Sequence, residues 1–188
     1  MQRILVVDDE PSIRELLNDF LTSKGFEIIT APDGEAALAI LKSEKFDLLL
    51  LDLMMPGMNG LDILREINSE KLDIPSIMIT AYASVPTAVE AMKLGAFDYI
   101  TKPFVLEDVN MAIKRALDVS RLQEENNRLK KELRKKFSAQ KIIGNSVPVQ
   151  EVIKFIEKIA DTDSTILVSG ESGTGKELVA KTIHYNSS

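Results

Sequence analysis

The 188-residue sequence contains no cysteine and a single histidine, His184. Without cysteine the chain can form neither a disulfide nor a thiolate nucleophile. One histidine, far along the chain, argues against a histidine-based metal site or a catalytic triad, and we expect His184 to be an ordinary helix residue. The N-terminus lacks the apolar core of a signal peptide, and no uncharged apolar stretch approaches membrane-spanning length. We therefore expect a soluble, cytoplasmic protein with no membrane attachment.

Charge is distributed unevenly along the chain. Residues 1–105 contain 9 Lys or Arg against 17 Asp or Glu, residues 106–138 contain 9 against 6, and residues 139–188 contain 5 against 6. The acidic first part argues against direct binding of nucleic acid. The basic stretch RLKKELRKKF at 128–137 could attract phosphates, but no base-reading motif accompanies it, and we favour a solvated helix face.

Apolar runs such as ILVV and LLLL are continuous rather than alternating, which is typical of strands buried on both faces of a parallel sheet. We predict strands at residues 4–7, 27–31, 48–51, 76–80 and 97–101. Helices are predicted at residues 12–23, 34–44, 60–68, 85–94 and from 106 onward. Five βα repeats predict an α/β fold with a doubly wound, flavodoxin-like parallel sheet in the order 2-1-3-4-5.

Polar side chains follow four of these strands at the point where each strand ends. Asp8 and Asp9 follow ILVV, Asp52 follows LLLL, and Thr80 and Lys102 end SIMIT and FDYITK. Ligands of such sheets bind outside the carboxyl ends of the strands, where strands one and three are neighbours. Three clustered carboxylates would repel one another unless a cation neutralised them, and such hard oxygen ligands suit Mg²⁺.

Each of these residues alone also has an ordinary explanation. Asp9 could cap the following helix, Thr80 could be a plain strand residue, and Lys102 could be solvated. The occurrence of all five polar residues in this order favours a common ligand-binding site at the end of the sheet. Gly57 and Gly60, in MMPGMNG, are predicted to be turn glycines of the loop after the third strand.

These residues, in this order and spacing, resemble the receiver domain of two-component response regulators over residues 1–117. The resemblance implies that Asp52 is the phosphoacceptor. It implies Mg²⁺ bound by Asp8, Asp9, Asp52 and the backbone carbonyl of Met54. It further implies that Thr80 and Lys102 contact the phosphoryl group, that Lys102-Pro103 is a cis peptide, and that Tyr99 is a switch residue. A carboxylate attacks an anionic donor poorly, so Mg²⁺ and an ammonium group would have to cancel charge.

The last predicted helix continues beyond the length that the sheet requires. Ala112 begins a seven-residue pattern, and its continuation forms a short predicted dimer seam at Val119, Leu122, Asn126, Leu129 and Leu133. Glu125 would lie opposite Lys130 of a parallel partner. A simple amphipathic linker helix fits the pattern equally well, but its position after a receiver favours the homodimer.

The sequence pattern after residue 138 differs from that of the preceding helix. The stretch IIGNSVPVQEVIKFIEKIA predicts a turn and an amphipathic helix, and STILVSG predicts a buried strand. A glycine loop then opens a final helix, which is the context of a phosphate-binding loop. Its residues are Gly170, Glu171, Ser172, Gly173, Thr174, Gly175, Lys176 and Glu177, with glutamate in place of the usual Ser or Thr.

IIGNS followed by GESGTGKE resembles the start of the AAA+ domain of NtrC-type transcription activators, in which this glutamate belongs to the pattern. The resemblance implies a receiver at 1–117, a fifth helix and coiled-coil linker at 106–138, and an AAA+ fragment at 139–188. Its implied partners are a histidine kinase and, through domains beyond this sequence, DNA and RNA polymerase with the RpoN-type sigma factor. The sequence ends before a Walker B acid, so we expect no ATP hydrolysis by this chain, and ATP as a cofactor only in a longer parent. One strand and two helices cannot bury an ATPase core, so we expect residues 139–188 to be loosely ordered.

Three functions remain as alternatives. The first is a phosphorylation-switched regulator that controls dimer geometry and hence a transcription-activating ATPase. The second is a nucleotide-binding fragment that depends on Lys176. The third is a constitutive coiled-coil dimerisation module that needs no phosphate.

Overall fold

The computed structural model describes residues 1–81, 84–137, 146–159, 162 and 165–186. Its Cα positions divide into two compact units, Met1–Arg121 and Leu122–Ser188. None of the helices in the described ranges combines the length and the apolar character needed to cross a lipid bilayer.

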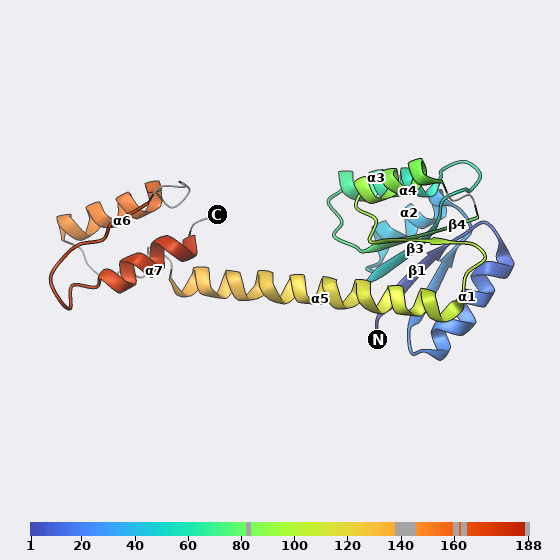
Figure 1. Ribbon diagram of the computed structural model, residues 1–188, viewed down its shortest axis with the longest axis horizontal. Helices are drawn as coiled ribbons and strands as arrows, with labels where there is room; N and C mark the ends of the chain where they lie inside the picture. Colours follow the sequence, from blue (N-terminus) through green and yellow to red (C-terminus); the bar gives the residue numbers. More distant parts are fainter. Residues whose placement is uncertain (82–83, 138–145, 160–161, 163–164, 187–188) are drawn as a thin grey trace. The chain divides into compact units, whose positions relative to one another are not determined.

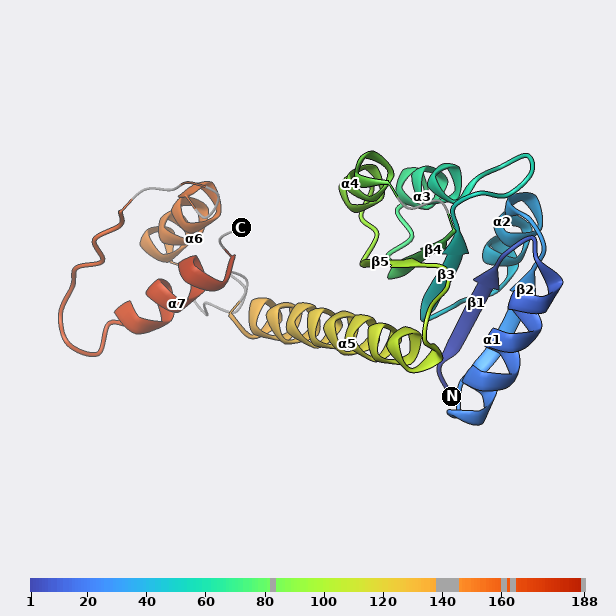
Figure 2. The same cartoon turned by 45° about the vertical axis from the view of Figure 1, so that its right-hand side comes forward.

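The first unit is built on five parallel strands in the order β2-β1-β3-β4-β5 (Figure 2). Their bounds are β1 Arg3–Val7, β2 Glu27–Ala31, β3 Leu48–Asp52, β4 Ser76–Thr80 and β5 Asp98–Thr101. The predicted strands and their order are confirmed, and each predicted strand end lies within one residue of the observed one. Continuous apolar runs carried this prediction because β3 and β4 are buried along their whole length.

Helices α1 to α5 cover the two faces of this sheet (Figure 1). They are α1 Pro11–Ser23, α2 Gly34–Ser43, α3 Gly60–Ser69, α4 Val85–Lys93 and α5 Leu106–Lys136. The core under α1 and α5 joins Leu17, Leu21 and Ile113 to Ile4 and Ile77. The core on the other face lies under α2, α3 and α4. Because successive strand residues point to opposite faces, each central strand supplies side chains to both cores.

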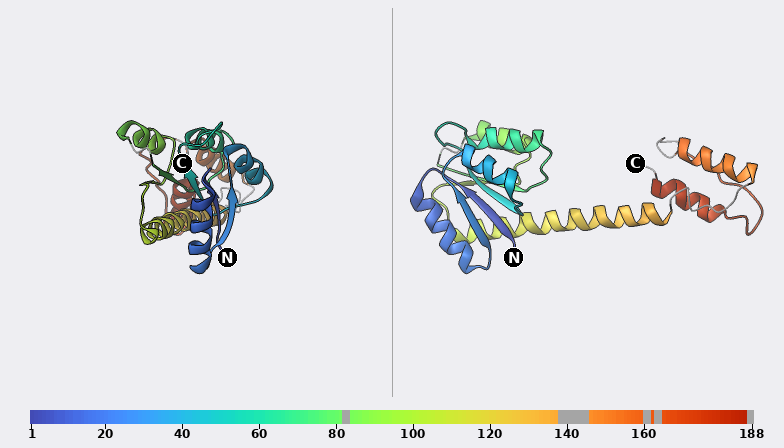
Figure 3. Two further views of the ribbon diagram at one scale, coloured as in Figure 1. Left: turned by 90° about the vertical axis from the view of Figure 1, so that its right-hand side faces the viewer. Right: turned by 180° about the vertical axis from the view of Figure 1, so that it is seen from behind.

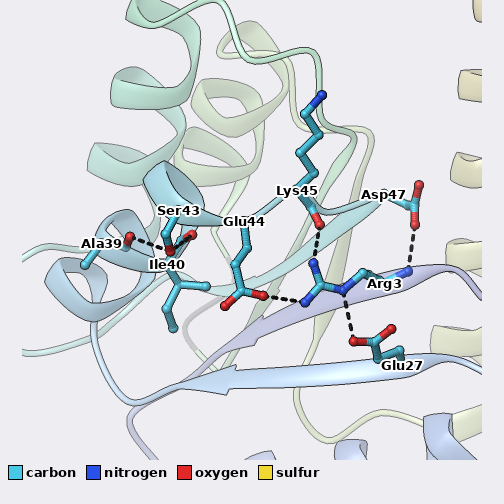
Figure 4. A network of polar contacts seen from close by, with 8 residues as sticks. All are labelled: Arg3, Glu27, Ala39, Ile40, Ser43, Glu44, Lys45 and Asp47. Carbon is cyan, nitrogen blue, oxygen red and sulfur yellow. Dashed lines mark hydrogen bonds and ion pairs between the residues drawn. The ribbon is translucent and has the colours of Figure 1, made fainter.

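Arg3, the first residue of β1, is the centre of a network of polar contacts (Figure 4). Its guanidinium group pairs with Glu27 of β2 at 3.0 Å and with Glu44, and donates to the backbone carbonyl of Lys45 at 2.9 Å. Its backbone N–H donates to the Asp47 carboxylate at 2.7 Å. These contacts tie β1 to β2 and to the segment that enters β3.

Helix α5 extends well beyond the residues that pack on the sheet. Ala112 is buried in the core of the first unit, so this first position of the predicted heptad pattern is not available to a seam. Every side chain from 121 to 132 is exposed, including Leu122 at 60 % and Leu129 at 47 %. The predicted continuation of the helix is confirmed, while its dimer contacts stay a prediction.

The second unit contains α6 Val147–Ile159 and α7 Lys176–Asn186, which lie beside one another (Figure 3). The Tyr185 ring stacks on Phe137 with 4.9 Å between ring centroids, and Asn186 donates to the Phe137 carbonyl at 2.8 Å. The predicted helix after IIGNS is confirmed, whereas residues 142–145 of that motif lie outside the described residues.

The strand predicted at 164–170 is wrong for the residues that the structure describes. Residues 165–170 have no regular secondary structure, and Leu167 is 91 % exposed. An apolar run becomes a buried strand when neighbouring strands pair with it, and the described part of this unit offers none. Ile166, Leu167 and Val168 therefore line an open apolar hollow beside α6 and α7.

Candidate functional site

The carboxylates predicted to cluster do lie together at the carboxyl end of the sheet. Strands β1 and β3 are parallel neighbours in which Val7 pairs with Leu51, so Asp8 and Asp52 follow side by side. Asp8 and Asp52 are buried, whereas the adjacent Asp9 is exposed. One carboxylate oxygen from each of the three lies within 4.8 Å of the other two.

Lys102 enters this cluster from the end of β5. Its ammonium lies 2.7 Å from Asp8 Oδ2 and 3.5 Å from Asp52 Oδ2. Its backbone N–H donates to the Thr80 carbonyl at 2.7 Å, which fixes the segment against the end of β4. The peptide bond between Lys102 and Pro103 is cis, as predicted. The lysine side chain is 10 % exposed, so it is a component of the site rather than a solvated end.

The site raises the pKa of Asp52 above its ordinary value. Burial is the main cause, the charge of Lys102 opposes it, and the charge of Asp8 adds to it. Burial by itself would lower the pKa of Lys102, but the hydrogen bond and charge of Asp8, with the charges of Asp52 and Glu10, outweigh burial and raise it. The raised pKa keeps the Lys102 ammonium cationic in the site.

One oxygen of this site is left for a ligand. Asp52 Oδ1 is buried and has no hydrogen-bond partner among the described residues. A buried carboxylate oxygen is costly to leave unpaired, and its neighbours are further hard oxygen donors. The group therefore fits a small divalent cation such as Mg²⁺. Met54, whose carbonyl was predicted to join the ligands, follows Asp52 by two residues and has an exposed side chain.

The raised pKa of Asp52 gives a prediction about stability. The native state holds this proton more tightly than the unfolded chain, so the stabilising contribution is complete below the ordinary aspartate pKa and is lost as pH rises through the raised value. At neutral pH the ionised group is a net cost. We expect Asp52→Asn to raise the free energy of unfolding on the order of 1 kcal/mol in chelator, the usual scale of a single substitution.

Urea denaturation measures this change, with Asp73→Asn as the control because Asp73 is exposed and lies outside the cluster. Added Mg²⁺ should reduce the difference in the free energy of unfolding between the wild type and Asp52→Asn. A variant that is less stable than the wild type in chelator would contradict the prediction.

Thr80 and Tyr99 occupy one face of the sheet. Met78 pairs with Tyr99 across β4 and β5, and both pack in the core under α2, α3 and α4. Thr80 lies two residues after Met78 and therefore on the same face. Thr80 is fully buried, whereas Tyr99 is half-buried and its hydroxyl lies 3.2 Å from Thr87 Oγ1 of α4.

Glu10 is a member of the site that the sequence reasoning missed. Its carboxylate lies 3.4 Å from the Lys102 ammonium, and its backbone N–H donates to Asp8 Oδ1 at 2.9 Å. The signal in the sequence is a third acid directly after Asp8 and Asp9, but which strand end it faces follows from the fold. Glu10 is exposed, so it forms the outer rim of the cluster.

Gly60 has a different role from the predicted turn glycine. A Cβ added at this first residue of α3 would lie 2.3 Å from the Asp52 carbonyl oxygen and 2.7 Å from the Met78 side chain. The helix can therefore approach the strand that carries Asp52 because this position has no side chain. Gly57, by contrast, has φ +78 and open space around it, which is the predicted turn geometry.

We expect Gly60→Ala to lower the free energy of unfolding by about 1–3 kcal/mol, because the backbone at Asp52 or the start of α3 must shift. Gly57→Asn is the control in the same loop, since asparagine tolerates the left-handed conformation. Urea denaturation of both variants checks the prediction, and equal stability of the two would contradict it.

The predicted phosphate-binding loop precedes α7 in the second unit. Gly170, Gly173 and Gly175 have positive φ angles, and helix α7 begins at Lys176. The Lys176 ammonium donates to the loop's own carbonyls, at Gly170 with a distance of 2.9 Å and at Glu171. Glu177 pairs with Lys181 one turn later at 2.6 Å. The loop thus has its expected glycines and lysine, without the strand predicted before it.

A doubly wound parallel sheet with an acidic cluster and a lysine at its carboxyl edge defines the receiver class of fold. Residues 4–114 match the response regulator receiver domain family, and residues 142–188 match the sigma-54 interaction domain family. The chain belongs to the response regulator receiver domain family, and the segment joined to it gives the domain order of NtrC-type regulators.

Individual relatives agree with this assignment. The regulatory protein AtoC of Escherichia coli K12 is 42 % identical over 187 residues, which cover 100 % of this chain and 41 % of AtoC. The nitrogen assimilation regulatory protein NtrX of Azorhizobium caulinodans is 36 % identical, over 96 % of this chain and 39 % of that protein. The chain thus spans about two fifths of the length of these curated relatives.

Solved structures show the same similarity. A receiver domain protein from Methanospirillum hungatei superposes with a TM-score of 0.63 and 32 % identity, over 65 % of this chain and 98 % of that one. NtrX from Brucella abortus, crystallised in complex with ADP, superposes with a TM-score of 0.66 and 38 % identity, over 100 % of this chain and 42 % of that one.

Proposed function

We propose that this chain is a phosphorylation-switched regulator in which Asp52 accepts a phosphoryl group from a histidine kinase. The observation that carries the proposal is the buried Asp52 carboxylate, which has one oxygen unpartnered among the described residues and Lys102 beside the other. Membership of the receiver family supports it. A structural ion pair alone would not require three carboxylates around one lysine.

In the proposed reaction an Asp52 oxygen attacks phosphorus in line with the departing group of the donor. A P–O bond forms on Asp52 as the donor's bond to phosphorus breaks, and the product is an acyl phosphate. Asp9, Asp52, the Met54 carbonyl and, through water, Asp8 would hold Mg²⁺, which supplies positive charge against the repulsion between the two anions. Lys102 is already within 3.5 Å of Asp52 and would pair with a phosphoryl oxygen, and Thr80 would donate its hydroxyl to another.

The test is intact mass after incubation with Mg²⁺ and acetyl phosphate. We expect one added phosphoryl group on the wild type and on the control Asp73→Asn, and none on Asp52→Asn, which keeps the shape of the side chain but removes the nucleophile. Chelator should abolish the addition. Phosphorylation of Asp52→Asn at the wild-type rate, or none on the wild type while a known receiver is modified, would overturn the proposal.

The proposed output passes through α5 to the sigma-54 interaction domain. Phosphorylation would change the surface of α4, β5 and α5, and a homodimer through the exposed seam of α5 would carry that change onward. Control of sigma-54 RNA polymerase in the cytoplasm is the role that we propose for a regulator in which this receiver is joined to a complete sigma-54 interaction domain. ATP belongs to that role through the loop of Gly170 to Glu177, whereas the 188 residues themselves are proposed to act as a regulator and not as an enzyme.

A further inference from the structure

Three hydroxyl groups meet where β5 faces the first turn of α4. Thr87 Oγ1 lies 2.9 Å from the Ser84 hydroxyl, 3.0 Å from the Ser84 carbonyl oxygen, 3.3 Å from the Ser84 backbone nitrogen and 3.2 Å from the Tyr99 hydroxyl. The Ser84 hydroxyl accepts the Thr87 backbone N–H at 3.2 Å and completes a capping box at the start of α4. One threonine side chain thus joins the cap of a helix to the ring of Tyr99.

The Thr87 hydroxyl links these groups at the start of α4. A threonine hydroxyl has one proton and two lone pairs, so it can donate one hydrogen bond and accept two. Thr87 donates to the Ser84 carbonyl and accepts the Ser84 backbone N–H. In the contact with Tyr99 either hydroxyl can be the donor. This bond holds the aromatic ring toward α4, on the face of the sheet that also carries Thr80.

We propose that Thr87 is a positioning residue that restrains Tyr99 in its present orientation and so biases the receiver against its phosphorylated conformation. The inference rests on the proposed function, because only a phosphoacceptor has a phosphorylated conformation to disfavour. In the proposed function phosphorylation changes the surface of α4 and β5. A movement of the Tyr99 ring away from the first turn of α4 breaks its bond to Thr87, because Thr87 is fixed by its bonds to Ser84. Thr87 therefore adds to the cost of switching without touching Asp52 or the phosphoryl group.

The probe is beryllium fluoride with Mg²⁺, which coordinates a carboxylate oxygen as a stand-in for the phosphoryl group. Binding that requires a minor conformation is weakened by the scarcity of that conformation. We expect Thr87→Val to tighten binding by about two- to tenfold, or about 0.4–1.4 kcal/mol at 1.4 kcal/mol per tenfold, the range of one net hydrogen bond. Isothermal titration calorimetry measures the dissociation constant.

Three further variants separate restraint of Tyr99 from damage to the helix cap. Thr87→Ser keeps the hydroxyl and should bind like the wild type. Ser84→Ala removes the cap and the contact between the Ser84 and Thr87 hydroxyls. It keeps the bonds of Thr87 to the Ser84 backbone and to Tyr99, and should not tighten the binding of beryllium fluoride. In a Tyr99→Phe background the hydrogen bond is already absent, so Thr87→Val should have no further effect.

The inference is overturned if Thr87→Val binds beryllium fluoride as the wild type does, or more weakly. It is also overturned if Thr87→Val changes this binding equally in the wild-type and Tyr99→Phe backgrounds. Acetyl phosphate labelling of the wild type distinguishes these results from failure of the proposed function. If the wild type is labelled but Thr87→Val has the same effect in the wild-type and Tyr99→Phe backgrounds, the role proposed for Thr87 is wrong and the role of Asp52 as phosphoacceptor is retained. If the wild type is neither labelled nor binds beryllium fluoride, both fail.

Discussion

Lys102→Met is expected to lower the free energy of unfolding by about 3 kcal/mol in chelator, because it removes one partner of a buried ion pair. The Asp8 carboxylate is 3 % exposed and has the lysine ammonium at 2.7 Å. Without that cation Asp8 and Asp52 remain as buried like charges at the end of adjacent strands. Phosphorylation by acetyl phosphate should also slow by about a hundredfold, since a positioned charge on the transferred group is lost.

Mg²⁺ should restore most of the lost stability, because it supplies positive charge to the same carboxylates and binds the folded state alone. Urea denaturation with chelator and with Mg²⁺ measures both effects. Lys45→Met is the matched control, since Lys45 is exposed and its side chain in Figure 4 makes none of the contacts drawn. An equal loss in both variants, or the same response of Lys102→Met and the wild type to Mg²⁺, would contradict a charge-compensating role.

The receiver fold was predictable because its strands are buried on both faces. The apolar residues of β1, β3 and β4 are continuous and do not alternate with polar ones. Each of these strands is followed by a helix, as the crossover between parallel strands requires. Once strands one and three are neighbours, Asp8 and Asp52 must meet. Geometry therefore confirmed the acidic cluster and the position of Lys102, although the chemical roles of these residues remain proposals.

Features that depend on contacts between distant segments were not predictable. Gly60 looks like a turn glycine until α3 is packed against the Asp52 carbonyl. Thr87 looks like a helix cap until β5 brings Tyr99 to it. The apolar run at 165–170 reads as a strand because its pattern says nothing of whether pairing strands are present. In each case the sequence specifies a local preference and the tertiary neighbours decide its use.

Substitutions in the exposed stretch of α5 are expected to have a large effect on dimer formation. Leu122 and Leu129 are the two apolar side chains between residues 121 and 132, and they are seven residues apart. A helix that is otherwise polar all round gains little from folding alone, whereas a partner helix would bury both leucines. Asn126 lies between them at a position where asparagine favours a two-stranded coiled coil in one register.

Changing Leu122 and Leu129 together to glutamine should raise the dissociation constant of the dimer by at least about a hundredfold, because each leucine contributes about 2 kcal/mol of burial. Sedimentation equilibrium measures it, and glutamine keeps the helix propensity. The control pair Glu124→Gln and Lys131→Gln changes the same helix away from the seam at unchanged net charge.

Monomers in every wild-type state would exclude the seam. A dimer whose small-angle scattering profile is the same with and without acetyl phosphate would support constitutive dimerisation, whereas a profile that changes on phosphorylation would connect the seam to Asp52.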